Sequence, residues 1–208
     1  MCTPFLRHMP ARSLPRQVAV ALATIEDLPE NSRCRPDAER RVSRIAARRA
    51  IRRLAGDDVT IEIRRRSERA PTARVRNAES DVVSVAIALT HRDGRAAAIA
   101  APAGTRIGID IERLDAVRPE HQRYFLSAAE RRVALGTHGT TLWALKEAAW
   151  KALQLDGSVG FKGLDLAMNG TAELTAVSCD GRRYDAVSAV SVPWTGYVMV
   201  AVVLEEVA

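Results

Sequence analysis

Lysine is scarce in this sequence. The chain has 208 residues, of which 31 are lysine or arginine, and only three of these are lysines. These are Lys146, Lys151 and Lys162, and two of them lie in the stretch WALKEAAWK, residues 143–151. An ordinary solvent-exposed helix face accepts arginine as readily as lysine. The retention of lysine here indicates a site that requires a compact ammonium group.

Cysteine and long apolar runs are also rare. The three cysteines, Cys2, Cys34 and Cys179, are scattered and odd in number, which excludes a disulfide framework and a metal-binding cysteine motif. No apolar run approaches the length needed to span a bilayer, and residues 1–16 lack the apolar core of a secretory signal. These absences predict a cytoplasmic protein without a membrane partner.

The composition is that of a globular protein with an excess of positive charge. Hydrophobic residues make up 47% of the chain, which excludes disorder, and the net charge of +6 favours an acidic partner. Nucleic acid, a phosphorylated metabolite and an acidic protein all fit that charge. Fifteen of the 28 arginines lie between Arg33 and Arg76. A general preference for arginine throughout the proteome would explain this bias without any binding role.

The hydrophobic pattern predicts the same order of elements twice. The first half is predicted to contain a helix from 36 to about 54, closed by Gly56, and strands at 17–25, 59–65, 81–90 and 96–101. The second half is predicted to contain helices at 119–136 and 139–155 and strands at 105–114, 164–168, 172–178 and 196–204. We therefore expect an α+β fold, a pseudo-dimer of two similar α/β halves over residues 1–104 and 105–208. Each half would be an antiparallel sheet with a long helix packed on it.

The stretch IGIDIERLD places two carboxylates side by side. Asp110 and Glu112 are two residues apart, so on a strand they project from one face while the intervening isoleucines enter the core. Like charges this close favour a cation or a proton between them. Magnesium is typically held by one or two carboxylates together with substrate phosphates. The alternative is a solvated strand face.

The stretch WALKEAAWK adds a third carboxylate. Glu147 and Lys151 are four residues apart and share one helix face, which Trp143 and Trp150 can help to anchor. Taken alone, the pair would be an ordinary surface ion pair, and the tryptophans would be core residues.

Together the two stretches resemble the 4′-phosphopantetheinyl transferases of the pseudo-dimeric, surfactin-synthetase-activating (Sfp) type. The signature of that family is a GxDxE strand followed by a W-x-x-KE-x-x-x-K helix. The matching residues are Gly108, Asp110, Glu112, Trp143, Lys146, Glu147 and Lys151.

The resemblance extends beyond the signature. Thr90-His91 is similar to the family's Ser-His pair, residues 123–130 resemble its aromatic-rich segment ending in glutamate, and Arg49 is the best match to its helix arginine. One departure is that Arg69-Ala70-Pro71 stands where the family commonly has Gly-Lys-Pro, so the lysine is missing.

The resemblance implies transfer of the 4′-phosphopantetheine arm of coenzyme A to a serine of an apo acyl or peptidyl carrier protein, with release of adenosine 3′,5′-bisphosphate. It implies that Asp110, Glu112 and Glu147 hold Mg²⁺ and that Asp110 is also catalytic. Glu147 would serve as the general base as well, either directly or through a metal-bound water. Lys151, one helical turn further on, would meet the charge that grows on the leaving group.

Coenzyme A contacts are expected from Arg49, Thr90, His91, Lys146 and Lys151. Arg49 suits the 3′-phosphate, because guanidinium binds phosphate bidentately. His91 is expected at a phosphate, with a structural role at the strand end as the alternative. Lys146 projects away from Lys151 on the helix and is expected to contact either a phosphate or the backbone.

The expected protein partner is an acidic carrier, which suits the basic surface. Carriers of fatty acid, polyketide and non-ribosomal peptide synthesis all remain open. A monomer is expected, because two halves in one chain form the cleft that smaller relatives build between subunits. Two alternatives are an inactive coenzyme A-binding protein and a nucleic-acid-binding module. The second would use the helix stripe Arg41, Arg44, Arg48 and Arg52.

Overall fold

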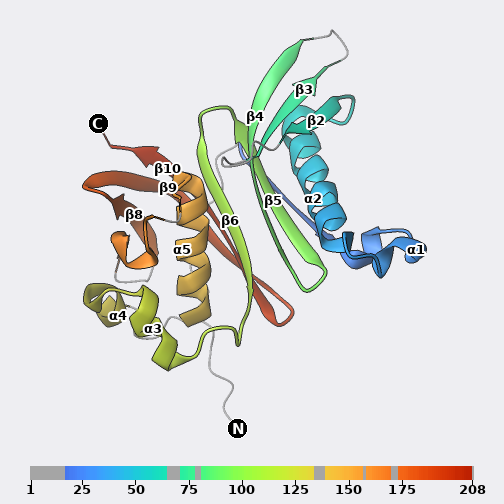
Figure 1. The fold of residues 1–208 in the computed structure, drawn as a ribbon. Coiled ribbons are helices and arrows are strands. Elements are labelled where there is room, and N and C mark those ends of the chain that lie inside the picture. Colours follow the sequence, from blue (N-terminus) through green and yellow to red (C-terminus); the bar gives the residue numbers. More distant parts are fainter. Residues whose placement is uncertain are drawn as a thin grey trace.

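The computed structural model describes residues 17–64, 71–77, 81–133, 139–156, 158–169 and 173–207. Within these ranges the chain forms two five-stranded antiparallel sheets. The sheets face each other, and one long helix covers the outer side of each, which gives four layers (Figure 1). None of the helices in the described ranges combines the length and hydropathy needed to cross a membrane.

The first sheet has the strand order β1-β5-β4-β3-β2 and carries helix α2, Ala38–Ala55, on its outer face. Two short helices, η1 (Ile25–Asp27) and α1 (Glu30–Arg33), lie between β1 and α2. The strands are β1 (Ala19–Thr24), β2 (Thr60–Arg64), β3 (Thr72–Arg76), β4 (Val82–Arg92) and β5 (Arg95–Pro102).

The second sheet repeats this order as β6-β10-β9-β8-β7 and carries helix α5, Gly139–Leu153. Its strands are β6 (Arg106–Arg113), β7 (Leu164–Met168), β8 (Leu174–Cys179), β9 (Arg182–Trp194) and β10 (Tyr197–Glu206). The short helices of this half are η2 (Pro119–His121), α3 (Gln122–Phe125), α4 (Ala128–Val133) and η3 (Phe161–Gly163). The same strand order in both sheets confirms the predicted α+β fold of two similar halves.

Small side chains on β5 allow the two halves to pack closely. Ala96, Ala98 and Ala100 belong to the core under α2, whereas Ala97, Ile99 and Ala101 belong to the core between the sheets. This division follows the period of two along a strand. A strand buried on both faces reads as a continuous apolar run, as the sequence RAAAIAAP does.

Gly108 brings helix α5 against strand β6. A Cβ atom at this position would lie 1.8 Å from the carbonyl oxygen of Ala148 and 2.9 Å from the amide nitrogen of Ala152. Only glycine permits this approach, because both contacts are to the helix backbone and no side-chain rotation relieves them. The helix residues on either side of Ala148 therefore lie over the β6 residues that follow Gly108.

The prediction of a single helix over 119–136 is wrong. The chain leaves helix α3 at Leu126, which has an extended backbone, and residues 134–136 lie outside the described ranges. Ser127 then starts α4: the Ser127 amide donates to Glu130 Oε2 at 2.7 Å, and the Glu130 amide donates to Ser127 Oγ at 3.2 Å. This reciprocal capping box begins a new helix instead of extending the first.

The sequence analysis also missed strands β3 and β9. Strand β3 is short and alternates buried and exposed positions with arginine on its exposed side. Strand β9 pairs with β8 across Asp180 and Gly181, which have φ angles of 50° and 75°. Positive φ at both central residues is typical of the tight hairpin turn that an Asp-Gly pair favours.

We predict that Gly108→Ala destabilises the protein by about 3 kcal/mol, because the new methyl group must push the α5 backbone off β6. Urea unfolding measures this change. Gly160→Ala is the matched control, because Gly160 has an ordinary φ of −72° and open space around its Cβ position. Equal stability of the two variants would contradict the close approach of α5 to β6.

Candidate functional site

Two acidic side chains of β6 face helix α5. Asp110 and Glu112 follow Gly108 at intervals of two, so all three project from the β6 face that α5 covers. Asp110 is 4% exposed, and the Glu112 side chain is 13% exposed. Lys151 of α5 reaches this face, and its Nζ lies 2.6 Å from Asp110 Oδ1 and donates to the Ile109 carbonyl at 3.2 Å.

The two oxygens of Asp110 have different surroundings. Oδ1 accepts hydrogen bonds from Lys151 and, at 3.1 Å, from the Thr90 hydroxyl on β4. Oδ2 is buried and has no hydrogen-bond partner among the described residues. Burial raises the pKa of Asp110, and the neighbouring Lys151 ammonium and the hydrogen bonds oppose that rise. A buried carboxylate oxygen without a donor leaves a lone pair available to a cation.

Glu112 and Glu147 complete an acidic cluster with Asp110. Burial raises the pKa of Glu112, the Asp110 charge raises it further, and Arg92 on β4 opposes the rise. Burial likewise raises the pKa of Glu147, Lys151 opposes this, and the charges of Asp110 and Glu112 add to it. Three neighbouring carboxylates, two of which have their pKa raised by the charge of another, favour the binding of a cation or a proton between them.

The donor set of this cluster fits magnesium, a hard ion that prefers oxygen ligands. Asp110 Oδ2 is the oxygen most clearly available to such an ion. Among the described residues, no three His, Cys, Asp or Glu side chains converge closely enough to hold a metal ion. Mg²⁺ often uses only one or two protein carboxylates and takes its other ligands from water and substrate phosphate. The cluster satisfies that smaller requirement.

Strand β4 sends Thr90 and His91 in opposite directions. Thr90 lies on the side of β4 that faces the second sheet, where it contacts Asp110. His91 lies on the side that faces α2, and its Nδ1 is 3.2 Å from Glu39 Oε2. The structure therefore brings Thr90 to the carboxylates but does not bring His91 to them.

Arg49 lies on α2 and holds η1 against the helix. Its guanidinium donates two hydrogen bonds to Asp27, at 2.9 and 2.6 Å, and one to the Leu22 carbonyl at 3.0 Å. These hydrogen bonds lower the pKa of Asp27. None of the described contacts of Arg49 involves the carboxylate cluster.

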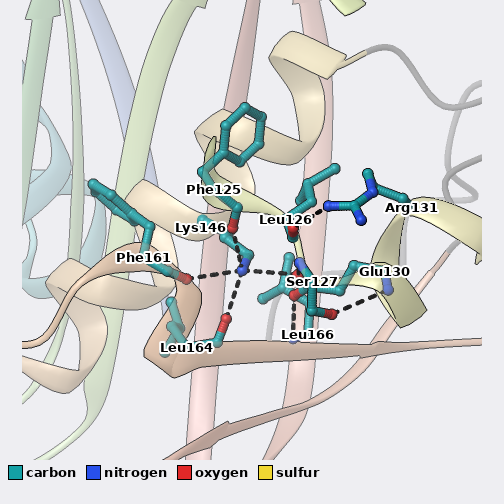
Figure 2. Close-up of polar contacts among 9 residues, drawn as sticks. All are labelled: Phe125, Leu126, Ser127, Glu130, Arg131, Lys146, Phe161, Leu164 and Leu166. Carbon is teal, nitrogen blue, oxygen red and sulfur yellow. Dashed lines mark hydrogen bonds and ion pairs between the residues drawn. The ribbon is translucent and has the colours of Figure 1, made fainter. Parts of the chain in front are cut away.

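Lys146 lies inside the protein, and Figure 2 shows its ammonium at the centre of several polar contacts. Nζ donates to the backbone carbonyls of Phe125, Phe161 and Leu164 at 2.8, 2.9 and 2.7 Å. It also lies 2.9 Å from Glu130 Oε2, and the Lys146 side chain is 0% exposed. The charge of Lys146 is thus enclosed by protein oxygens, and none of these contacts brings it to the carboxylate cluster. The alternative expectation of a backbone contact is confirmed.

The Lys146–Glu130 pair joins three segments of the second half. Glu130 accepts hydrogen bonds from the backbone amides of Ser127, at 2.7 Å, and Leu166, at 2.8 Å, and so links α4 to β7. Its ion pair with Lys146 links both of these elements to α5 (Figure 2). Burial lowers the pKa of Lys146, and Glu130 opposes that effect. Two buried charges are tolerated here because each is paired and hydrogen-bonded.

Sequence reasoning missed Arg92 and Glu130 as residues of functional interest. Arg92 follows Thr90 at an interval of two and so shares its face of β4, but the predicted strand ended at residue 90 and left Arg92 outside it. Glu130 was noted only as the end of an aromatic-rich segment, although Ser127-x-x-Glu130 is the spacing of a capping box.

Residues 106–202 match the model of the 4′-phosphopantetheinyl transferase superfamily. The matched range begins with β6 and ends within β10, and it contains the three carboxylates and both lysines of α5. No curated protein matches the chain. The family match supports a transferase of the phosphopantetheinyl type, a class that uses coenzyme A as its substrate and carrier proteins as its partners.

We predict that Lys146→Met destabilises the protein by about 3–5 kcal/mol, because it leaves the buried Glu130 carboxylate unpaired and three carbonyls without a donor. Urea unfolding again provides the measurement. Lys162→Met is the matched control, since Lys162 is an exposed lysine in the same region, and should change stability by less than about 0.5 kcal/mol. A Lys146→Met variant as stable as this control would contradict the structural role.

We predict that Glu147→Gln raises the melting temperature of the protein in EDTA at neutral pH. The pKa of Glu147 lies above its ordinary value of 4.5 in the folded state. Folded protein therefore binds more protons than unfolded protein between those two values, and stability falls as pH rises through that window. Glutamine avoids this loss, so the gain should vanish below about pH 4 and be complete above the window. Thermal denaturation across pH, with Glu205→Gln as the exposed control, tests this; a pH-independent difference would contradict it.

Proposed function

We propose that this chain transfers the 4′-phosphopantetheine moiety of coenzyme A to a serine of an apo acyl or peptidyl carrier protein in a Mg²⁺-dependent reaction. We assign it to the surfactin-synthetase-activating type. The observation that carries this proposal is the cluster of Asp110, Glu112 and Glu147 around Lys151, formed by the strand and helix that the family match contains.

The reaction exchanges one phosphorus–oxygen bond for another. The carrier serine oxygen forms a bond to the phosphorus that bears the pantetheine arm, and the bond from that phosphorus to the bridging oxygen breaks. The electron pair stays on the bridging oxygen, which leaves as part of adenosine 3′,5′-bisphosphate. The serine proton must go to a base, and the negative charge on the leaving phosphate must be neutralised.

Glu147 is the proposed base. Its burial and its carboxylate neighbours raise its pKa, which makes it a better proton acceptor than an exposed glutamate. Lys151 is the proposed partner of the leaving phosphate, because its ammonium is half-buried at the cluster and lies one helical turn beyond Glu147. Asp110 orients that ammonium through the 2.6 Å contact and is for that reason included among the catalytic residues.

Asp110, Glu112 and Glu147 are the proposed ligands of Mg²⁺, and the three carboxylates would have to draw closer together for all of them to hold the ion. When bound, the ion supplies Lewis-acid polarisation of the phosphates and a template for substrate. The buried and unpartnered Asp110 Oδ2 supports this assignment.

We assign nucleotide contacts to the N-terminal half, residues 1–104, and the metal site and catalytic helix to residues 105–208. Thr90 lies at the cluster and suits a phosphate contact through its hydroxyl. Arg49 and His91 remain proposed contacts of coenzyme A, and each would have to exchange its carboxylate partner for the ligand. Because the two halves pack together within one chain, we propose that the protein is a monomer. We also propose that it is cytoplasmic and needs neither nucleic acid nor a membrane.

We predict that Glu147→Gln lowers the rate of transfer to an apo carrier protein by about 100-fold or more, the contribution typical of general acid–base catalysis. Transfer of a fluorescent coenzyme A derivative, followed on a gel, measures this rate, and Glu205→Gln is the matched control. Asp110→Asn should lose activity to a similar extent.

Unchanged transfer in both variants would contradict the assigned roles. A wild-type protein that binds coenzyme A but transfers nothing to any carrier class would instead support the inactive coenzyme A-binding alternative. Salt-sensitive binding to DNA or RNA without affinity for coenzyme A would support the arginine-rich helix as a nucleic-acid-binding surface.

A further inference from the structure

Most of the basic residues that were expected to bind coenzyme A are engaged elsewhere. Lys146 is enclosed by carbonyls and Glu130, His91 pairs with Glu39, and Arg49 pairs with Asp27. Among these residues only Lys151 lies at the carboxylate cluster. Three carboxylates and a diphosphate together carry more negative charge than Mg²⁺ and one ammonium supply, so a second side-chain cation at this site would strengthen binding.

Arg92 is the second cation at the cluster. Ala88 and Thr90 show that alternate residues of β4 face the second sheet, and Arg92 continues this series. Its Nη1 lies 3.7 Å from Glu112 Oε2, and the charge of Arg92 lowers the pKa that burial raises in Glu112. The Arg92 side chain is 46% exposed, whereas that of Glu112 is 13% exposed. The guanidinium therefore stands between a nearly buried carboxylate and solvent.

The contact between Arg92 and Glu112 leaves the guanidinium available to a ligand. At 3.7 Å the pair lies beyond hydrogen-bond distance, and within the described ranges the Arg92 side chain makes no other hydrogen bond or ion pair. By contrast, the Lys151 ammonium donates two hydrogen bonds. A planar guanidinium with five donors binds phosphate oxygens bidentately.

We propose that Arg92 is a substrate-binding residue that contacts the diphosphate of coenzyme A. This role rests on the proposed function. In the absence of substrate the guanidinium partly neutralises Glu112. With substrate bound, Arg92 donates to the diphosphate oxygens at the Glu112 end of the cluster, and Lys151 acts at the Asp110 end. The two cations thus lie at the two carboxylates of β6.

Calorimetric titration with coenzyme A and with 3′-dephospho-coenzyme A, both in Mg²⁺, tests this role. Arg92→Gln should weaken the binding of both ligands equally, by about 10-fold or more, the usual effect of losing a hydrogen bond to a charged group. Arg92→Lys, which keeps the charge but loses the fork of donors, should have an intermediate affinity. Arg113→Gln is the control, because Arg113 adjoins Glu112 on β6 but pairs with Asp115, and it should bind both ligands as the wild type does.

Titration with Mn²⁺ in the absence of coenzyme A separates ligand binding from damage to the site. Arg92→Gln removes a positive charge beside Glu112, so it should bind Mn²⁺ at least as tightly as the wild type. A variant that loses affinity for both Mn²⁺ and coenzyme A has a disturbed site, which overturns a specific contact to substrate.

The remaining outcomes are also distinguishable. Wild-type affinity for both ligands in Arg92→Gln overturns the role of Arg92 and leaves the proposed function intact. A loss of affinity for coenzyme A alone, with 3′-dephospho-coenzyme A unaffected, assigns Arg92 to the 3′-phosphate and overturns the diphosphate contact. Wild-type protein that binds neither ligand overturns the proposed function together with this inference.

Discussion

The site depends on one backbone contact, the approach of helix α5 to strand β6 at Gly108. The missing Cβ atom lets the Ala148 carbonyl lie where a side chain would otherwise stand. Because the helix is this close, Glu147 and Lys151 meet the carboxylate that follows Gly108 at an interval of two. The interactions of Glu147 and Lys151 with the β6 carboxylates are therefore set by the distance between one strand and one helix, and a substitution that changes this distance changes all of them.

The two lysines of WALKEAAWK have separate roles, and burial decides between them. Lys146 is fully enclosed and satisfies three carbonyls and a carboxylate, a task for which a compact ammonium with three donors is suited. Lys151 is only half-buried and faces the acidic cluster. The two lysines of this helix, five residues apart, thus meet two different requirements. The role of Lys146 is structural, and the role of Lys151 we propose to be catalytic. Arginine, with its larger planar head, suits neither geometry.

The sequence predicted the layered α+β fold through apolar periodicity, which is a local property, whereas the meeting of β6 with α5 was implied by the family resemblance. It could not predict where Lys146 or His91 points. Those directions depend on the carbonyls of Phe161 and Leu164 and on Glu39, which are distant in the sequence and are brought near only by folding. The long predicted helix at 119–136 failed for a different reason. The capping box at Ser127 is a local signal, and it interrupts a helical pattern that otherwise reads as continuous.

Intact-mass spectrometry of a purified apo carrier protein, incubated with this chain, coenzyme A and Mg²⁺, tests the central claim most directly. A parallel sample contains EDTA. The account predicts that the carrier gains the mass of one phosphopantetheine arm and that EDTA prevents the gain. No gain with fatty acid, polyketide or non-ribosomal peptide carriers would contradict the proposed transfer, and a gain that persists in EDTA would contradict the metal site at Asp110, Glu112 and Glu147.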